Sequence, residues 1–177
     1  MHPPFQNLFD EIESQRKSIL DSLRHMTVDQ LNEAPASGKW SVSQILSHLI
    51  TAERMSVMYM QKKIQGVAES GDTGLWEEVK INVLKISQRL PGLKFRAPQK
   101  VVENTTLYND HSTIIHEWDL VRGELKLLLE KIPAQYVNRR IYRHVLAGYL
   151  NARQALIFLR EHVTHHVPQI KKLVNKN

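Results

Sequence analysis

The chain has 177 residues, of which 42% are hydrophobic and 24% charged, as is ordinary for one globular domain with a sizeable core. It contains no cysteine, which excludes disulfides, thiolate nucleophiles and cysteine-bound zinc, so any bound metal would need histidine or carboxylate ligands. No apolar run is long enough to span a membrane, and the first residues lack the pattern of a secretory signal. We therefore expect a single domain over residues 1–177, located in the cytoplasm and without a membrane partner.

The formal net charge of +6 raises the question of an anionic partner. Basic residues are dispersed in small groups such as Lys62-Lys63 and Arg139-Arg140, and no basic run is interleaved with aromatic residues. A nucleic-acid interface concentrates its positive charge on one face or along one helix. We expect no nucleic-acid partner. The basic groups are interpreted as a solvated surface, with binding of an anionic small molecule as the alternative.

Apolar residues recur at steps of three and four along most of the chain, which is typical of amphipathic helices. In chain order, the spacing predicts a long helix over residues 5–26, a short helical turn over 28–32, a long helix over 42–65 and a shorter helix over 75–90. Two further long helices follow, one from a cap at Asn109 or Asp110 to residue 132, and one from about residue 151 through His162 and His166, which Pro168 is expected to kink or end near His166. In the shorter helix, Val79, Val83, Ile86 and Leu90 form the predicted core face. Residues 93–108 are predicted to be irregular. Segment 141–145 could be extended but has no evident strand partner. The fold class is therefore all-α, a four-helix bundle with one additional shorter helix.

Two histidines of the last predicted helix, His162 and His166, are four residues apart. This spacing places both rings on one face of a helix, close enough to share a metal ion. Both also lie on the apolar stripe of that helix, and buried polar groups reduce stability unless they are paired. The pair is therefore either part of a metal site or a hydrogen-bonded structural pair.

A third histidine, His48, occupies a similar position on the second long helix, between Ile45 and Ala52 on its apolar stripe. Metal sites in helical bundles are built from side chains that facing helices present to one another. Three imidazoles around a divalent ion leave one coordination position open, which is the catalytic arrangement. Taken alone, His48 would be interpreted as an ordinary core histidine.

Two motifs in the sequence resemble those of a known family. Residues 38–49 read GKWSVSQILSHL and Glu53 follows, which resembles the signature G-K-W-S-x-x-Q-x-L-x-H-L-x-x-x-E of the DinB/YfiT-like superfamily. Residues 162–170 read HVTHHVPQI, which is similar to the H-x-x-H-H-x-x-Q-I ending of that family. The motifs lie near opposite ends of the chain, so the resemblance covers nearly all of it.

This resemblance implies an up-down-down-up helical bundle, usually a homodimer, with zinc or nickel held by His48, His162 and His166. The better understood members resemble S-transferases that use bacillithiol, mycothiol or a related low-molecular-weight thiol, and many others are described as metal-dependent hydrolases. A surplus of apolar positions late in the second long helix, such as Met55, Met58 and Tyr59, gives some support to a dimer.

Other polar residues near these motifs have alternative interpretations. Gln44 lies one turn before His48 and could orient a ligand at the metal, or it is a polar residue at the rim. Trp40 is interpreted as a core residue or as part of the pocket entrance. Glu53 points away from His48 and is expected to pair or pack, while Glu161 is expected to be solvated. His165 is off the ligand face and is not expected to bind the metal.

Three functions remain open from the sequence. A thiol S-transferase would use the metal to activate a low-molecular-weight thiol for attack on an electrophile. A hydrolase would use a metal-bound water and would need a base, but no Asp or Glu lies on the histidine stripes. The third alternative is a non-catalytic metal-binding bundle. The transferase is favoured.

Overall fold

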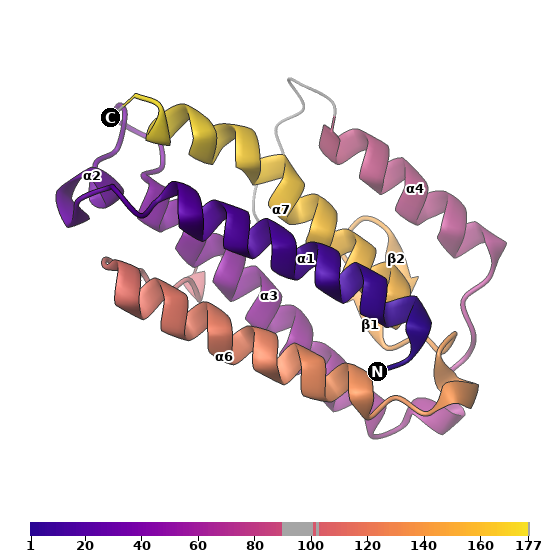
Figure 1. Cartoon of the computed structure of the whole chain (residues 1–177). Helices are drawn as coiled ribbons and strands as arrows, with labels where there is room; N and C mark the ends of the chain where they lie inside the picture. The colour runs from indigo at the N-terminus through magenta and orange to yellow at the C-terminus, as the bar shows by residue number, and fades with distance from the viewer. Residues whose placement is uncertain (90–100, 102, 177) are drawn as a thin grey trace.

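The structure is a computed structural model that describes residues 1–89, 101 and 103–176. It consists almost entirely of helices arranged side by side, with one small hairpin (Figure 1). The described α-helices are α1 (Pro3–Ser22), α2 (Val28–Asn32), α3 (Val42–Ile64), α4 (Leu75–Arg89), α6 (His111–Glu130) and α7 (Ala152–Val174). Two 3₁₀ turns (Val67–Glu69 and Ala134–Tyr136) and the strands β1 (Tyr142–His144) and β2 (Gly148–Leu150) complete the described elements. Most of the segment predicted to be irregular, residues 93–100 and 102, lies outside the described residues, as does Leu90.

Helices α1 and α7 run in the same direction through the bundle (Figure 1). Their cross-links follow the same order in both helices: Arg160 donates to Glu11 at 2.5 Å, and Gln15 donates to Thr164 at 2.8 Å. Polar groups on the edges of the two helices therefore fix their register. The same edge-to-edge pairing leaves the apolar faces of both helices directed at the core.

Helices α3 and α6 form the second parallel pair, and they run opposite to α1 and α7 (Figure 1). Arg54 on α3 contacts Glu117 on α6 at 2.6 Å, and Ser47 accepts a hydrogen bond from the Tyr108 N–H just before α6. In chain order the four long helices thus run up, down, down and up, as the family resemblance implies. A four-helix bundle with this topology is confirmed.

Capping side chains set the starts of the two helices that carry the histidine motifs. At the start of α3 the Ser41 side chain accepts from the Gln44 N–H, and the Gln44 side chain accepts from the Ser41 N–H. Asn151 and Gln154 make the same reciprocal pair at the start of α7. Such capping boxes satisfy backbone donors that have no partner within the helix. The predicted starts of both helices are confirmed.

Helix α4 has the predicted extent, but the predicted core face is wrong. Val79, Val83 and Ile86 are between 49% and 60% exposed, whereas Ile81 and Leu84 are the buried residues. The side of α4 that carries Ile81 and Leu84 faces the bundle, and Glu78 and Arg89 pair there with Arg153 and Glu161 of α7. The predicted apolar stripe of α4 therefore faces solvent.

Along the chain, a two-stranded antiparallel hairpin follows α6 and precedes α7. The sequence contains no indication of a strand pair there. Tyr142 pairs with Leu150, and His144 pairs with Gly148. Gly148 has a φ of +76°, a backbone conformation that glycine adopts without strain. The strands have three residues each, too few to produce a readable alternation of polar and apolar positions. The prediction of an unpaired segment is thus wrong in this detail, within a fold that is otherwise helical.

No helix in the described parts of the chain is long and apolar enough to cross a membrane.

Candidate metal centre

His48 on α3 and His162 and His166 on α7 meet inside the bundle. One ring nitrogen from each residue lies within 4.8 Å of the other two. The ring centroids are 5.0 Å apart for His48 and His162, 5.2 Å for His48 and His166, and 5.1 Å for His162 and His166. The three imidazoles therefore form a nearly equilateral cluster, which is the arrangement required of a shared metal site.

The spacing of the nitrogens fits a divalent ion. His48 Nε2 and His162 Nε2 are 3.1 Å apart. Two nitrogens bound tetrahedrally at about 2.0–2.1 Å from one ion would lie about 3.3 Å apart. A small outward movement of either ring would bring the pair to that separation. The ligand set of imidazoles alone suits zinc or nickel rather than magnesium or calcium, which prefer oxygen ligands.

Burial keeps the three rings in the neutral form that binds metals. His48 and His166 are only 5% and 7% exposed, and burial lowers the pKa of each from 6.5 to about 4. The pKa of His162 is also lowered well below its ordinary value, by burial and then by His166 and His48. Each ring therefore retains a nitrogen lone pair at neutral pH, so protons do not compete with a metal there.

Neighbouring groups orient the cluster. His166 Nδ1 lies 3.1 Å from the side-chain oxygen of Gln169, and a proton on Nδ1 leaves the Nε2 lone pair free for a metal. Phe158 stacks on His162 with the rings 5.6 Å apart and 11° from parallel. Trp40 contacts His48 with ring centroids 5.1 Å apart, and it is 39% exposed. Trp40 thus lies where the site meets solvent, the second of its two predicted positions.

Gln44 lies one helical turn before His48, as predicted, but it is exposed and its side-chain oxygen accepts from the Ser41 N–H. The structure therefore gives Gln44 a capping function at the start of α3. An orienting function at the metal stays a prediction, and it would have to use the amide nitrogen.

The two acidic residues near the motifs are both held in ion pairs. Glu53 accepts from Trp118 Nε1 at 3.1 Å and from Arg122 at 3.0 Å, which confirms a pairing function. Glu161 was predicted to be solvated, and this is wrong. It is 1% exposed and accepts from Arg89 at 2.5 Å and from Arg160 at 2.8 Å. The reason is that α4 covers the side of α7 from which Glu161 projects.

His165 lies beside the cluster and outside it. Its Nδ1 is 2.9 Å from the Gln88 carbonyl oxygen on α4, and its ring contacts that of His166 at 5.1 Å. The ring is thereby held off the ligand face, in agreement with the sequence prediction. His144 is a residue of strand β1, and its ring packs on Phe158 with the centroids 4.5 Å apart.

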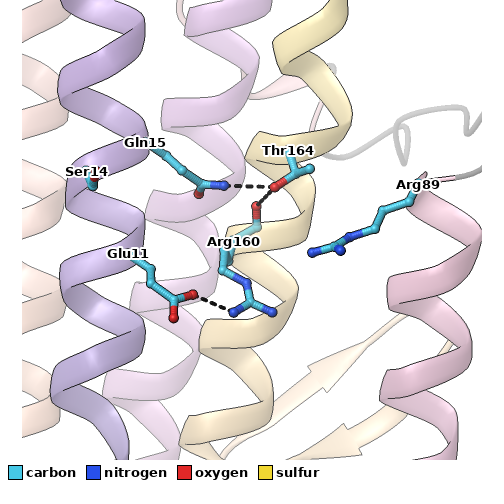
Figure 2. Close-up of a pocket in the computed structure, with 6 residues that line it drawn as sticks. All are labelled: Glu11, Ser14, Gln15, Arg89, Arg160 and Thr164. Carbon is cyan, nitrogen blue, oxygen red and sulfur yellow. Dashed lines mark hydrogen bonds and ion pairs between the residues drawn. The ribbon is translucent and has the colours of Figure 1, made fainter.

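A separate pocket lies between α1, α7 and the end of α4, lined by Glu11, Ser14, Gln15, Arg89, Arg160 and Thr164 (Figure 2). Its two arginines make it the natural place to look for an anionic ligand. However, Arg160 is paired with Glu11 and Glu161, and Arg89 is paired with Glu161. Two guanidinium groups and two carboxylates balance, so this pocket carries no excess positive charge. The metal centre remains the stronger candidate for chemistry.

Comparison with known proteins agrees with this arrangement. The chain is 22% identical over 161 residues to YuaE of Bacillus subtilis (strain 168), an uncharacterized protein, covering 91% of this chain and 93% of that protein. The structure of this chain is similar to that of YfiT from Bacillus subtilis, with a TM-score of 0.59 and 17% sequence identity. The match covers 97% of this chain and 86% of YfiT. YfiT is described as a probable metal-dependent hydrolase with an unusual four-helix bundle topology.

The sequence profile of one protein family covers most of the chain. The sequence profile of the DinB superfamily matches residues 11–170, which include all three histidines of the cluster. The chain therefore belongs to the DinB superfamily.

Proposed function

We propose that this protein is a metal-dependent thiol S-transferase in which His48, His162 and His166 hold zinc or nickel. The observation that carries the proposal is the convergence of three largely buried imidazoles within 4.8 Å of one another. Their lowered pKa values and the orientation of His166 by Gln169 support the same assignment. When bound, the ion would supply one open coordination position and would lower the pKa of a thiol or water placed there.

The surroundings of the cluster favour a thiol over water as the nucleophile. A hydrolase of this type needs a nearby base to accept the proton of water. No Asp or Glu belongs to the cluster among the described residues, and Glu53 and Glu161 are occupied by arginines. The two neighbouring histidines are also engaged at Nδ1, His165 with the Gln88 carbonyl and His144 with backbone N–H groups of the hairpin turn. A thiol is acidic enough to react without such a base, and the chain has no cysteine of its own. The sulfur would therefore come from a small cosubstrate.

In the proposed reaction, the thiol sulfur forms a bond to an electrophilic carbon of the second substrate. The leaving group departs with the electron pair of its bond, and the thiol proton is released to solvent. Phe158 and Trp40 would exclude water from two sides of the cluster, because both rings pack directly on its imidazoles. The chain thus contributes a largely buried site that has no free carboxylate among its described neighbours.

The alternative function is a metal-dependent hydrolase, and the structural similarity to YfiT is the observation that favours it. A non-catalytic metal-binding bundle is the third possibility. Paired assays separate the three functions: metal content, consumption of bacillithiol or mycothiol with 1-chloro-2,4-dinitrobenzene, and hydrolysis of p-nitrophenyl acetate. We expect metal-dependent thiol consumption that His48→Ala abolishes and that His116→Ala, an exposed histidine on α6, leaves intact.

Each other outcome has a defined meaning. Metal-dependent ester hydrolysis without thiol consumption would replace the transferase with the hydrolase. Stoichiometric metal without either activity would favour the non-catalytic bundle. Failure of zinc and nickel to bind the purified protein would contradict the proposal as a whole.

A further inference from the structure

The hairpin β1–β2 places a fourth histidine, His144, beside the metal centre. The hairpin is anchored to the bundle by Tyr142, whose hydroxyl lies 3.0 Å from Ser56 Oγ on α3 and whose ring stacks on Phe158 of α7. His144 is two residues further along the same strand, so its side chain points to the same face as Tyr142. Arg143 between them is exposed. His144 therefore projects toward the bundle, at the end of α7 that leads into the cluster.

One aromatic ring connects His144 to the metal centre. The His144 ring is 4.5 Å from that of Phe158, and Phe158 is stacked on His162. His144 is also close enough to His162 to contribute to the lowering of its pKa. No ring contact joins His144 directly to His48, His162 or His166 within the described residues. His144 thus lies next to the cluster without belonging to its ligand set.

Two backbone donors determine which nitrogen of His144 carries the proton. The N–H groups of Leu146 and Ala147 point at His144 Nδ1, at 3.2 and 3.1 Å. A nitrogen that accepts from backbone N–H groups holds a lone pair and no proton. Burial lowers the pKa of His144 to about 4, so the ring is neutral at pH 7. Its proton is therefore on Nε2, which faces away from the hairpin turn.

We propose that His144 is a positioning residue whose Nε2–H donates a hydrogen bond to the ligand that completes the coordination of a metal at the three-histidine site. The group that it recognises is an acceptor with negative charge, such as a thiolate sulfur or an oxyanion. Because Nε2 carries a proton, His144 is a donor and not a fourth ligand for the metal. This inference rests on the proposed metal site and adds the residue that selects what binds there.

Two substitutions separate this function from a purely structural one. In His144→Asn, the amide oxygen occupies the position of Nδ1 and can still accept from the turn, but the donor at Nε2 is lost. In His144→Gln, the amide nitrogen reaches the position of Nε2 and the acceptor for the turn is lost. The probe is azide, an anion that can enter an open metal position in either of the proposed chemistries. Its binding is followed by the visible spectrum of the Co²⁺-loaded full chain.

We expect wild type and both variants to bind one Co²⁺ per chain with similar affinity. His144→Asn should raise the Kd of azide about tenfold, as expected for the loss of one hydrogen bond to a charged group, with little change in Tm. His144→Gln should keep most of the azide affinity while its Tm falls. His116→Asn serves as the matched control, with Kd and Tm unchanged.

Three results would overturn the inference. Equal azide affinity in wild type and His144→Asn would show that Nε2–H does not contact the ligand. A loss of affinity in His144→Gln with none in His144→Asn would assign His144 to the turn alone. Failure of the wild-type chain to bind Co²⁺ would remove the metal site and this inference with it, whereas the first two results leave the metal site standing.

Discussion

His48 Nε2 and His162 Nε2 lie 3.1 Å apart, although 114 residues separate them in the chain. Two neutral imidazole nitrogens at this distance need a shared proton or a shared cation, because two facing lone pairs repel. His48 Nδ1 is buried and has no hydrogen-bond partner among the described groups, so the protein alone satisfies this ring poorly. A metal ion shared by the two Nε2 atoms would remove the repulsion between their lone pairs.

The first prediction concerns the ligands of that metal. His48→Ala, His162→Ala and His166→Ala should each weaken zinc or nickel binding sharply, because each removes one ligand and leaves two. His165→Ala should leave binding nearly intact, since the His165 ring is held by the Gln88 carbonyl. Isothermal titration calorimetry of the metal-free protein measures these affinities.

The matched controls for these three variants are His116→Ala and His25→Ala, which alter exposed histidines. A metal peak held by His165, seen by anomalous scattering from metal-soaked crystals, would disprove this ligand assignment. The ion should instead lie between His48, His162 and His166, with imidazole nitrogens at about 2.0–2.1 Å if it is zinc.

The second prediction is that the metal-free protein loses stability between pH 6.5 and pH 4. In the unfolded chain a histidine takes up its proton near pH 6.5, whereas burial lowers the pKa of His48 and His166 in the folded state to about 4. The unfolded state thus binds more protons in this interval, and the free energy of unfolding falls as the pH falls. Above pH 6.5 both states are neutral and these groups contribute nothing.

The loss should be on the order of 1 kcal/mol per pH unit for each of the two histidines. Urea unfolding with a chelator present, at pH 7.0 and pH 5.5, measures it. His48→Gln should reduce the difference between the two pH values, and His116→Gln should not. An unchanged difference in His48→Gln would show that this histidine does not titrate abnormally.

Much of the bundle could be predicted from the sequence, because helical periodicity identifies which side of a helix is apolar. Periodicity also places the three histidines on apolar stripes, whereas the resemblance to the DinB/YfiT-like family assigns them to one metal site. His48 and His166 lie on such stripes, and both are buried where the stripes of α3 and α7 meet. Periodicity does not say which element covers a given face. The environment of Glu161 depends on α4 packing over α7, and the hairpin depends on Tyr142 packing on Phe158. Neither contact is local in sequence.

The third prediction is that the protein forms a homodimer through α4. The family resemblance leads us to expect a dimer, and the exposed apolar residues of the helix lie on one face: Leu75, Trp76, Val79, Val83 and Ile86. Exposed apolar patches larger than a few hundred Å² mark interaction sites on soluble proteins. By contrast, Met55 and Tyr59 on α3 are partly buried, and Tyr59 packs against Tyr142.

Val83→Glu should shift the protein to monomer at micromolar concentration, because a charge in an apolar interface is unfavourable. Light scattering measures the mass of each variant. Glu124→Lys, an exposed change on α6, should leave the oligomeric state as it is in wild type. A monomeric wild-type protein would count against the dimer, and a dimer that survives Val83→Glu would place the interface elsewhere.

The last prediction separates the function of Glu53 from that of the metal centre, although Glu53 belongs to the same sequence motif as His48. The carboxylate of Glu53 and the guanidinium of Arg122 are both 4% exposed and 3.0 Å apart. Glu53→Ala would leave Arg122 buried with Glu13 as its remaining partner, and should reduce the free energy of unfolding by about 3–5 kcal/mol. Glu124→Ala should change it by less than about 0.5 kcal/mol.

The double variant Glu53→Leu/Arg122→Met should recover most of that loss, because apolar replacement of both charges removes the unpaired group. All of these variants should still bind one metal ion per folded chain, since the hydrogen bonds that Glu53 accepts within the described residues come from Trp118 and Arg122 and not from the three histidines. Urea unfolding tests the predicted change in stability, and metal analysis tests the predicted metal content. Loss of metal from folded Glu53→Ala protein would instead show that the carboxylate supports the metal centre, and Glu53 would then join the site.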